Sequence, residues 1–440
     1  MRYFEHRARP NSERGIVGGA ARIRKCVGRL ITRGGAGDSY DARMMRRPLT
    51  AILAAAALVG CTVTNSTKPP TAPTAPSAPT APSAPSAALA PASLPAILCD
   101  LTGAQSPLGT QAEQGARLAL ADATGGSLPA AQSLDTASTA GIAASQARAA
   151  VVHHPMGIGF TDSDLALAGV PAFIESGKPF IVVGATDPGL PERCGPGTFL
   201  ACFGDDAQGV AAAEFGAARF GKRAAIVFDS RRTYPRTLAG YFRTHLGTAL
   251  EGSAVMEFDL AATAPPAIAP HLVGMRAEID FVYLALEPES IAPCLRAVRA
   301  ALPDVPVVGG DAFDFDGALQ LDGKPVDRVW FTTHAWLGEG ATPEAREFTA
   351  AFVRAYRTQP TAFAALGYDA ARLAVDARRR AGSDSPEAIA AALMATVDFR
   401  GVSGRMSFAA GPVPRKDVWV VAIAAGTRAL AERRPAFSRP

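Results

Sequence analysis

The segment 184–188 is the part of the sequence whose residue types point most directly to chemistry. It reads Gly-Ala-Thr-Asp-Pro and follows the apolar run 180–183, which predicts a buried strand. At the C-terminal end of a parallel strand, a turn of small residues exposes backbone N–H groups, and Thr186 adds a hydroxyl. Such turns bind ligands in α/β folds, and they suit anions such as carboxylates. An ordinary strand-to-helix loop with a helix cap explains the same residues equally well.

Catalytic and metal-binding motifs do not occur in the sequence. It contains no G-x-S-x-G, no Walker loop, no H-E-x-x-H and no G-x-G-x-x-G. His153 and His154 are adjacent, so on a strand they would point to opposite faces and could not share a metal ion. We therefore expect no enzymatic activity, no cofactor and no metal site.

The cysteines show no metal-binding spacing. Cys194 and Cys202 lie on either side of a Gly-Pro-Gly turn, and in an oxidising compartment they could form a disulfide that closes a small loop. Cys99 and Cys294 lie in apolar surroundings and are expected to be buried thiols.

The sequence that would position these residues alternates between short apolar runs and amphipathic helical segments. This alternation predicts βαβ units and parallel sheets covered by helices. About 350 residues of this pattern exceed one core, so two α/β lobes are expected. Near the end, three helices precede two short strands, which suggests that the chain crosses back between lobes and closes with a hairpin. The predicted strands are 96–99, 179–183, 223–228, 279–286, 305–309, 404–408 and 417–423, and the predicted helices are 111–123, 207–220, 237–250, 290–301, 343–356, 362–381 and 386–396.

Charge is distributed unevenly along the 440 residues. Residues 1–60 hold 12 of the 44 Lys and Arg residues but only 4 of the 40 Asp and Glu residues, so the remainder of the chain is slightly acidic. The folded part has no basic bias, which argues against nucleic acid as a partner. After residue 61 no apolar run approaches the length of about 20 residues that spans a membrane, which argues against a polytopic membrane protein.

The first 92 residues read as a leader and a tether. Residues 1–43 are polar and Arg-rich, and they are expected to be a disordered extension or to precede the true start codon. Residues 44–61 contain a short basic region and the apolar run 49–58, and they end in Leu-Val-Gly-Cys. This arrangement is a secretory signal and resembles a bacterial lipoprotein signal, which implies that Cys61 is lipidated. The Pro/Ala/Thr/Ser-rich linker 62–92 favours extended polyproline II and would hold the folded part away from the membrane.

The body resembles the Leu/Ile/Val-binding protein family, the type I periplasmic solute-binding proteins of ABC importers. Each matching motif is short, but they occur in the family's order with nearly its spacing. The motifs are residues 101–103, 108–109 and 115–120, the Gly-Ala-Thr loop at 184–186, the strand 279–283, Gly-Gly-Asp at 309–311, Gly-Tyr-Asp-Ala-Ala at 367–371, Gly-Val-Ser-Gly at 401–404, and Phe408.

This resemblance implies an α/β fold of two Rossmann-like lobes with parallel sheets, joined by three crossovers, with the ligand in the cleft between them. On this chain the leucine-binding-protein-like domain would cover residues 93–430. Lobe one would comprise about 96–203 and 334–397, and lobe two about 204–333 and 398–430.

The resemblance also implies roles for individual residues. Ser163 matches the serine that grips an amino acid's α-carboxylate, and Ala185 and Thr186 belong to the loop that shares this task. Asp311 matches the acidic residue that holds the α-ammonium, and Tyr234 matches an aromatic side chain beside the ligand. A carboxylate would thus meet hydroxyl and amide donors on one lobe, and an ammonium would meet a carboxylate on the other.

Two functions are consistent with these features. The first is a lipid-anchored receptor that captures an amino acid or a similar small polar solute and delivers it to an ABC permease. The second is an interaction protein of the same fold, such as an outer-membrane lipoprotein that activates a penicillin-binding protein, because the linker suits reach through a cell wall. In both, the body would lie at the periplasmic face of the envelope. Thr62 in place of aspartate implies outer-membrane sorting if the organism has two membranes.

Overall fold

The structure is a computed structural model that describes residues 94–126 and 133–436. The predicted extension 1–43, the signal peptide 44–61 with Cys61, and the linker 62–92 lie outside the described residues. Within those two ranges, no helix is both long and apolar enough to cross a bilayer.

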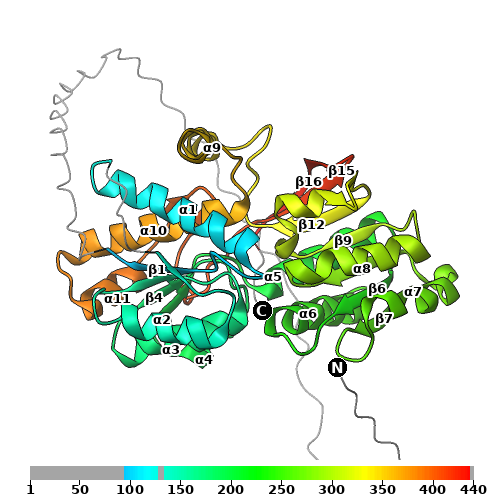
Figure 1. Ribbon diagram of the computed structural model, residues 1–440, viewed down its shortest axis with the longest axis horizontal. Helices are drawn as coiled ribbons and strands as arrows, with labels where there is room; N and C mark the ends of the chain where they lie inside the picture. Colours follow the sequence, from blue (N-terminus) through cyan, green and yellow to red (C-terminus); the bar gives the residue numbers. More distant parts are fainter. Residues whose placement is uncertain (1–93, 127–132, 437–440) are drawn as a thin grey trace, which may run out of the picture. The chain divides into compact units, whose positions relative to one another are not determined.

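Lobe one is built on a five-stranded parallel sheet with the strand order β2-β1-β3-β4-β5. Helices α1 and α10 cover one face of this sheet, and α2, α3 and α4 cover the other (Figure 1). Its strands are β1 (Ala96–Cys99), β2 (Ser133–Asp135), β3 (Gly157–Gly159), β4 (Phe180–Val182) and β5 (Thr198–Leu200). Its helices are α1 (Ser106–Ala123), α2 (Ala140–Ala150), α3 (Ser163–Glu175), α4 (Leu190–Cys194), α9 (Pro343–Tyr356), α10 (Ala362–Ala381) and α11 (Pro386–Met394).

Glycine allows the two helices over the first sheet to pack closely. A Cβ atom at Gly115 of α1 would collide with the carbonyl of Ala364, and one at Gly367 of α10 would collide with the carbonyl of Ala112. The two helices therefore touch backbone to backbone, which only glycine permits at these positions.

Lobe two is built on a seven-stranded sheet with the strand order β16-β15-β12-β9-β8-β6-β7. The strands β7, β6, β8, β9 and β12 are parallel, and β15 and β16 extend the sheet as an antiparallel edge. Its strands are β6 (Arg223–Phe228), β7 (Ala254–Asp259), β8 (Phe281–Ala285), β9 (Val307–Gly309), β12 (Val329–Thr333), β15 (Val418–Ala424) and β16 (Thr427–Arg434). Its helices are α5 (Asp205–Arg219), α6 (Thr233–Ala249), α7 (Pro265–Gly274) and α8 (Pro288–Ala301), and a small hairpin joins β10 (Gln320–Leu321) to β11 (Lys324–Pro325).

The chain passes between the lobes three times, after β5, after β12 and before β15. The α/β fold of two lobes with parallel sheets and three crossovers is thus confirmed. The predicted closing hairpin is wrong, however. The strand β14 (Gly404–Met406) pairs with β13 (Phe399–Gly401) and not with β15, because the tight turn between β13 and β14 brings these two segments together.

The β13–β14 hairpin lies on α10 of lobe one, so the third crossover begins after Met406, later than the boundary predicted at residue 398. Oδ1 of Asp369 in α10 accepts a 2.7 Å hydrogen bond from the amide of Val402, and Oδ2 accepts bonds of 2.7 and 2.5 Å from the amide and hydroxyl of Ser403. Nζ of Lys416 donates to Ser403 Oγ at 2.6 Å and to the carbonyl of Ala201 in the first crossover at 2.8 Å. One buried network therefore ties two crossovers to lobe one.

Candidate ligand-binding cleft

The Gly-Ala-Thr loop follows β4, as predicted, and its residues are buried. Its first two amides are not free for a ligand, because Gly184 N and Ala185 N both donate to the carbonyl of Phe160, at 3.0 and 3.3 Å. Phe160 itself adopts a positive φ of 60°. In the observed conformation, the hydroxyl of Thr186 faces Nε2 of Gln208 in lobe two, at 3.4 Å.

Asp311 and Tyr234 are brought together in lobe two. Asp311 follows β9, and its Oδ1 accepts a 2.7 Å hydrogen bond from the Tyr234 hydroxyl and a 3.0 Å bond from Gln208 Nε2. Its Oδ2 lies 2.8 Å from Nε2 of His334, and burial lowers the pKa of that imidazole, which favours its neutral form. Asp311 is only 2% exposed, so three internal partners replace water around its carboxylate.

A second carboxyl group, Asp205, lies at the start of α5 beside this network. Its Oδ1 accepts a 2.8 Å bond from Gln208 Nε2, while its buried Oδ2 has no hydrogen-bond partner among the described residues. Burial raises the pKa of Asp205 to about 8. The Asp205 carboxyl is therefore mostly protonated at neutral pH, because an ionised form would be poorly solvated.

Ser163 is the first residue of α3, and its fully buried hydroxyl has no partner among the described residues. The neighbouring Asp162 caps this helix, accepting bonds from the amides of Asp164 and Leu165 at 2.8 and 3.0 Å. Its other oxygen accepts a 2.5 Å bond from Nη2 of Arg232 in lobe two. The negative charge of Asp162 is thus directed at Arg232.

Arg232, which precedes α6, is surrounded by carboxylates from both lobes. Besides Asp162, its guanidinium lies 2.9 Å from Asp164 of lobe one and 3.6 Å from each of Glu287 and Glu289 in lobe two. Gln105 of lobe one adds a further bridge, because its Nε2 donates to Glu287 Oε2 at 2.7 Å. These bonds hold the lobes together, so the structure shows a closed cleft.

Known proteins share this architecture. A family model described as periplasmic binding protein matches residues 96–428. The chain belongs to this family. Leu/Ile/Val-binding protein homolog 1 of Brucella abortus (strain 2308) is 25% identical over 261 residues, which are 57% of this chain and 67% of that protein.

Two solved structures place this periplasmic binding protein among the type I, Leu/Ile/Val-binding members. The leucine-binding protein LivK of Thermotoga maritima MSB8 is 26% identical, with a TM-score of 0.72 over 78% of this chain and 99% of that one. The substrate-binding protein LivJ of Streptococcus pneumoniae, solved with isoleucine, is 23% identical, with a TM-score of 0.69 over 78% of this chain and 99% of that one. The resemblance read from the short motifs is therefore confirmed.

The suggested Cys194–Cys202 disulfide is not formed in this periplasmic binding protein, because all four described cysteines are free, buried thiols. Cys194 ends α4, and its Sγ lies 4.0 Å from the carbonyl of Ala166. Cys202 lies in the first crossover, and its Sγ lies 3.4 Å from the carbonyl of Ala185. The strand β5 separates the two thiols, so the Gly-Pro-Gly turn does not bring them together. Among the described residues, no group of three His, Cys, Asp or Glu side chains is arranged to hold a metal ion.

Several cleft residues of this binding protein were not singled out from the sequence: Gln105, Asp205, Gln208, Arg232 and His334. Asp205 and Gln208 are three residues apart at the start of a helix, a spacing that places them on one face. Arg232 carried a weaker signal, as one of two consecutive arginines in the loop after a predicted strand. Gln105 and His334 stand alone in the sequence and acquire partners only through the tertiary fold.

Proposed function

We propose that the protein captures an amino acid or a similar small polar solute outside the cytoplasm and presents it to an ABC importer. The observation that carries this proposal is the meeting of Thr186 from lobe one with Asp311 and Tyr234 from lobe two around the side chain of Gln208. Relatives named for leucine or solved with isoleucine support an amino acid as the kind of solute.

The cleft residues suit a zwitterionic solute whose charged groups would replace some of the hydrogen bonds within the protein. The α-carboxylate would take hydrogen bonds from the hydroxyls of Ser163 and Thr186, and the Ser163 hydroxyl has no internal partner among the described residues. The α-ammonium would pair with Asp311 in place of the Gln208 amide. Ala185 and Tyr234 would line the solute.

Closure would follow from the location of these groups on two lobes. A solute bound only to lobe one gains half of its contacts, and the other half forms when the lobes meet, so the solute favours the closed state. No group of the cleft needs to react with the solute, and the proposed role is capture without chemical change.

We further propose that the protein is anchored through a lipid on Cys61 and works at the periplasmic face of the envelope, on the outer membrane if there are two. This part rests on the signal-like segment 44–61 and the linker 62–92.

The test is thermal unfolding of the purified protein against a panel of twenty amino acids and small carboxylates. A ligand at 100 times its Kd adds about 2.7 kcal/mol of stability, which is easily measured. We expect a selective increase in Tm that is absent from Asp311→Ala. Because removal of Asp311 could unfold the protein, Ser163→Ala serves as a second variant, since its hydroxyl has no internal bond to lose among the described residues.

One observation favours the second function, an interaction protein such as an activator of a penicillin-binding protein. Most polar groups of the cleft already have partners within the protein, and Arg232 joins the two lobes directly. If no panel compound raises the Tm of folded protein free of carried-over ligand, solute capture is excluded for that panel and the interaction role becomes the better explanation.

A further inference from the structure

Acidic side chains outnumber basic ones where the two lobes meet. Seven carboxyl groups of the described residues lie where the lobes meet, and Arg232 is the cation that contacts four of them. Burial raises the pKa of Asp205 to about 8 and that of Glu287 well above its usual range, so these two favour their neutral forms. His334 is held neutral by burial, and Lys416 is bound to Ser403 at the hinge beside Asp369. The carboxyl groups belong to Asp100, Asp162 and Asp164 of lobe one and to Asp205, Glu287, Glu289 and Asp311 of lobe two.

Two buried oxygen atoms near Arg232 have no hydrogen-bond donor among the described residues. Nε2 of Gln105 donates to Asp162 at 3.2 Å and to Glu287 at 2.7 Å, which fixes the orientation of the amide. Oε1 of Gln105 and Oε1 of Glu287 are buried and accept no hydrogen bond from the described residues. Gln105 is 2% exposed and Glu287 is 5% exposed, so water does not satisfy these oxygens freely. Oε1 of Gln105 can only accept a hydrogen bond, and Oε1 of Glu287 lies 3.6 Å from Arg232 without a hydrogen bond, so the group that would satisfy both is a donor.

The contacts of Arg232 show that this site holds a cation. A single guanidinium lies within 3.6 Å of four carboxylates, two from each lobe. Burial raises the pKa of Glu287, and the nearby charge of Asp162 raises it further, so this carboxyl group favours its neutral form; a cation bound beside it would favour the ionised form. A second cation at this place would relieve repulsion between the lobes and stabilise the closed state.

We propose that the captured solute carries a cationic amine or guanidinium group in addition to its amino-acid head, and that this group binds among Asp162, Glu287 and Gln105. The proposal rests on the proposed function, since it assigns a second contact to the same solute. Because the acidic groups come from both lobes, the cation gains its full set of partners only on closure, and it therefore adds to the closing force.

The decisive experiment compares ligands that differ in charge but little in shape. Calorimetric titration of the wild-type protein with L-arginine and L-citrulline, and with L-lysine and L-norleucine, separates the effect of the cation from that of the chain. We expect the cationic member of at least one pair to bind ten-fold or more tightly than its neutral partner, with an advantage that shrinks at higher salt.

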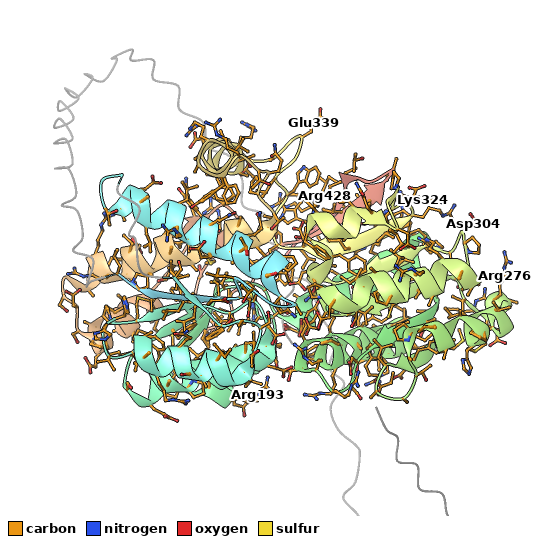
Figure 2. The ribbon with its side chains drawn as sticks, in the orientation of Figure 1. Arg193, Arg276, Asp304, Lys324, Glu339 and Arg428 are labelled. Atoms are coloured by element: carbon orange, nitrogen blue, oxygen red, sulfur yellow. The ribbon has the colours of Figure 1, made fainter. Side chains whose placement is uncertain are left out.

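A matched pair of variants localises the effect. We expect Glu287→Gln to reduce the preference for the cationic ligand about ten-fold, whereas Glu339→Gln, on an exposed loop away from the cleft (Figure 2), leaves it unchanged. The proposal is overturned if L-citrulline, L-norleucine or L-leucine binds as tightly as the cationic ligands; solute capture itself would then still stand. If no amino acid binds to the folded protein, the proposed function fails together with this inference. The ligand comparison on wild-type protein remains decisive even if Glu287→Gln does not fold.

Discussion

Nη2 of Arg232, which precedes α6 in lobe two, lies 2.5 Å from Oδ2 of Asp162, which caps α3 in lobe one. The same guanidinium reaches Asp164, whose Oδ1 also accepts a 2.5 Å bond from the hydroxyl of Thr233. Two loops that lie some 70 residues apart in the sequence thus meet through charge-assisted bonds, which are stronger than neutral ones. This contact ties lobe two directly to lobe one.

Replacing Arg232 with methionine should open the cleft. The variant removes the charge-assisted bonds from Arg232 in lobe two to Asp162 and Asp164 in lobe one, and the loss of these bonds disfavours the closed state. Small-angle X-ray scattering should show a larger radius of gyration for Arg232→Met than for the wild type. Arg231→Met is the matched control, because Arg231 pairs with Asp229 within its own loop and does not reach lobe one. Identical scattering from the two variants would show that Arg232 does not hold the lobes together.

Replacing Tyr234 with phenylalanine should cost about 1–2 kcal/mol of unfolding free energy. The change removes the 2.7 Å hydrogen bond to Asp311 and leaves one lone pair of a buried carboxylate without a donor. Urea denaturation measures the loss. Tyr241→Phe is not a suitable control because Tyr241 lies on the same helix as Tyr234. Tyr356→Phe is the control, because it removes a hydrogen bond from a tyrosine hydroxyl to a backbone carbonyl in lobe one. We expect only Tyr234→Phe also to weaken solute binding.

Replacing Lys416 with methionine should destabilise the hinge strongly. Lys416 is 2% exposed, and its loss leaves the carbonyl of Ala201 and the hydroxyl of Ser403 without the hydrogen bonds that its ammonium donates. Leaving a buried acceptor without its donor costs about 1–3 kcal/mol for each group. The neighbouring Arg415→Met is the control, because Arg415 is exposed and should change stability by less than about 0.5 kcal/mol. Equal stability of the two variants in denaturant would show that the Lys416 network contributes nothing.

The stability of the protein should fall as the pH rises towards 8, in part because of Asp205. The folded pKa of about 8 lies above the ordinary aspartate value of 3.8, so between these values the unfolded chain has released a proton that the folded protein retains. The unfolded chain therefore binds fewer protons than the folded protein. The stability contribution of Asp205 falls by up to about 1.4 kcal/mol for each pH unit across this window. Denaturation curves at several pH values should show a shallower decline for Asp205→Asn. An unchanged slope, matching that of the exposed control Asp304→Asn, would contradict the assignment.

The two lobes were predictable because local signals agree with the global fold. Strands such as β8 are short, continuous apolar runs, as expected for sheets that are covered on both faces, and the helices between them are amphipathic. The order of the motifs indicated the family, and this resemblance assigned Thr186 and Asp311 to the cleft. The structure confirms that Asp311 and Tyr234 are neighbours; their role in binding a solute stays a prediction.

The partners of the cleft residues were not predictable from local sequence. The amides of Gly184 and Ala185 looked available to an anion, but the carbonyl of Phe160, on another strand-to-helix loop, accepts both. Gln208 joins Thr186 to Asp311 from a third segment. Each of these bonds depends on how the sheets and helices pack, and no periodicity or motif within one segment contains that information.

Lys416 also determines how the lobes can move. Its ammonium joins the first crossover, at Ala201, to the β13–β14 turn, at Ser403, and it does so from within the third crossover. Neither crossover can bend alone without breaking one of these bonds. We therefore expect the two crossovers to bend together, as one joint, and a receptor with such a joint would offer its transporter two distinguishable outlines, empty and loaded.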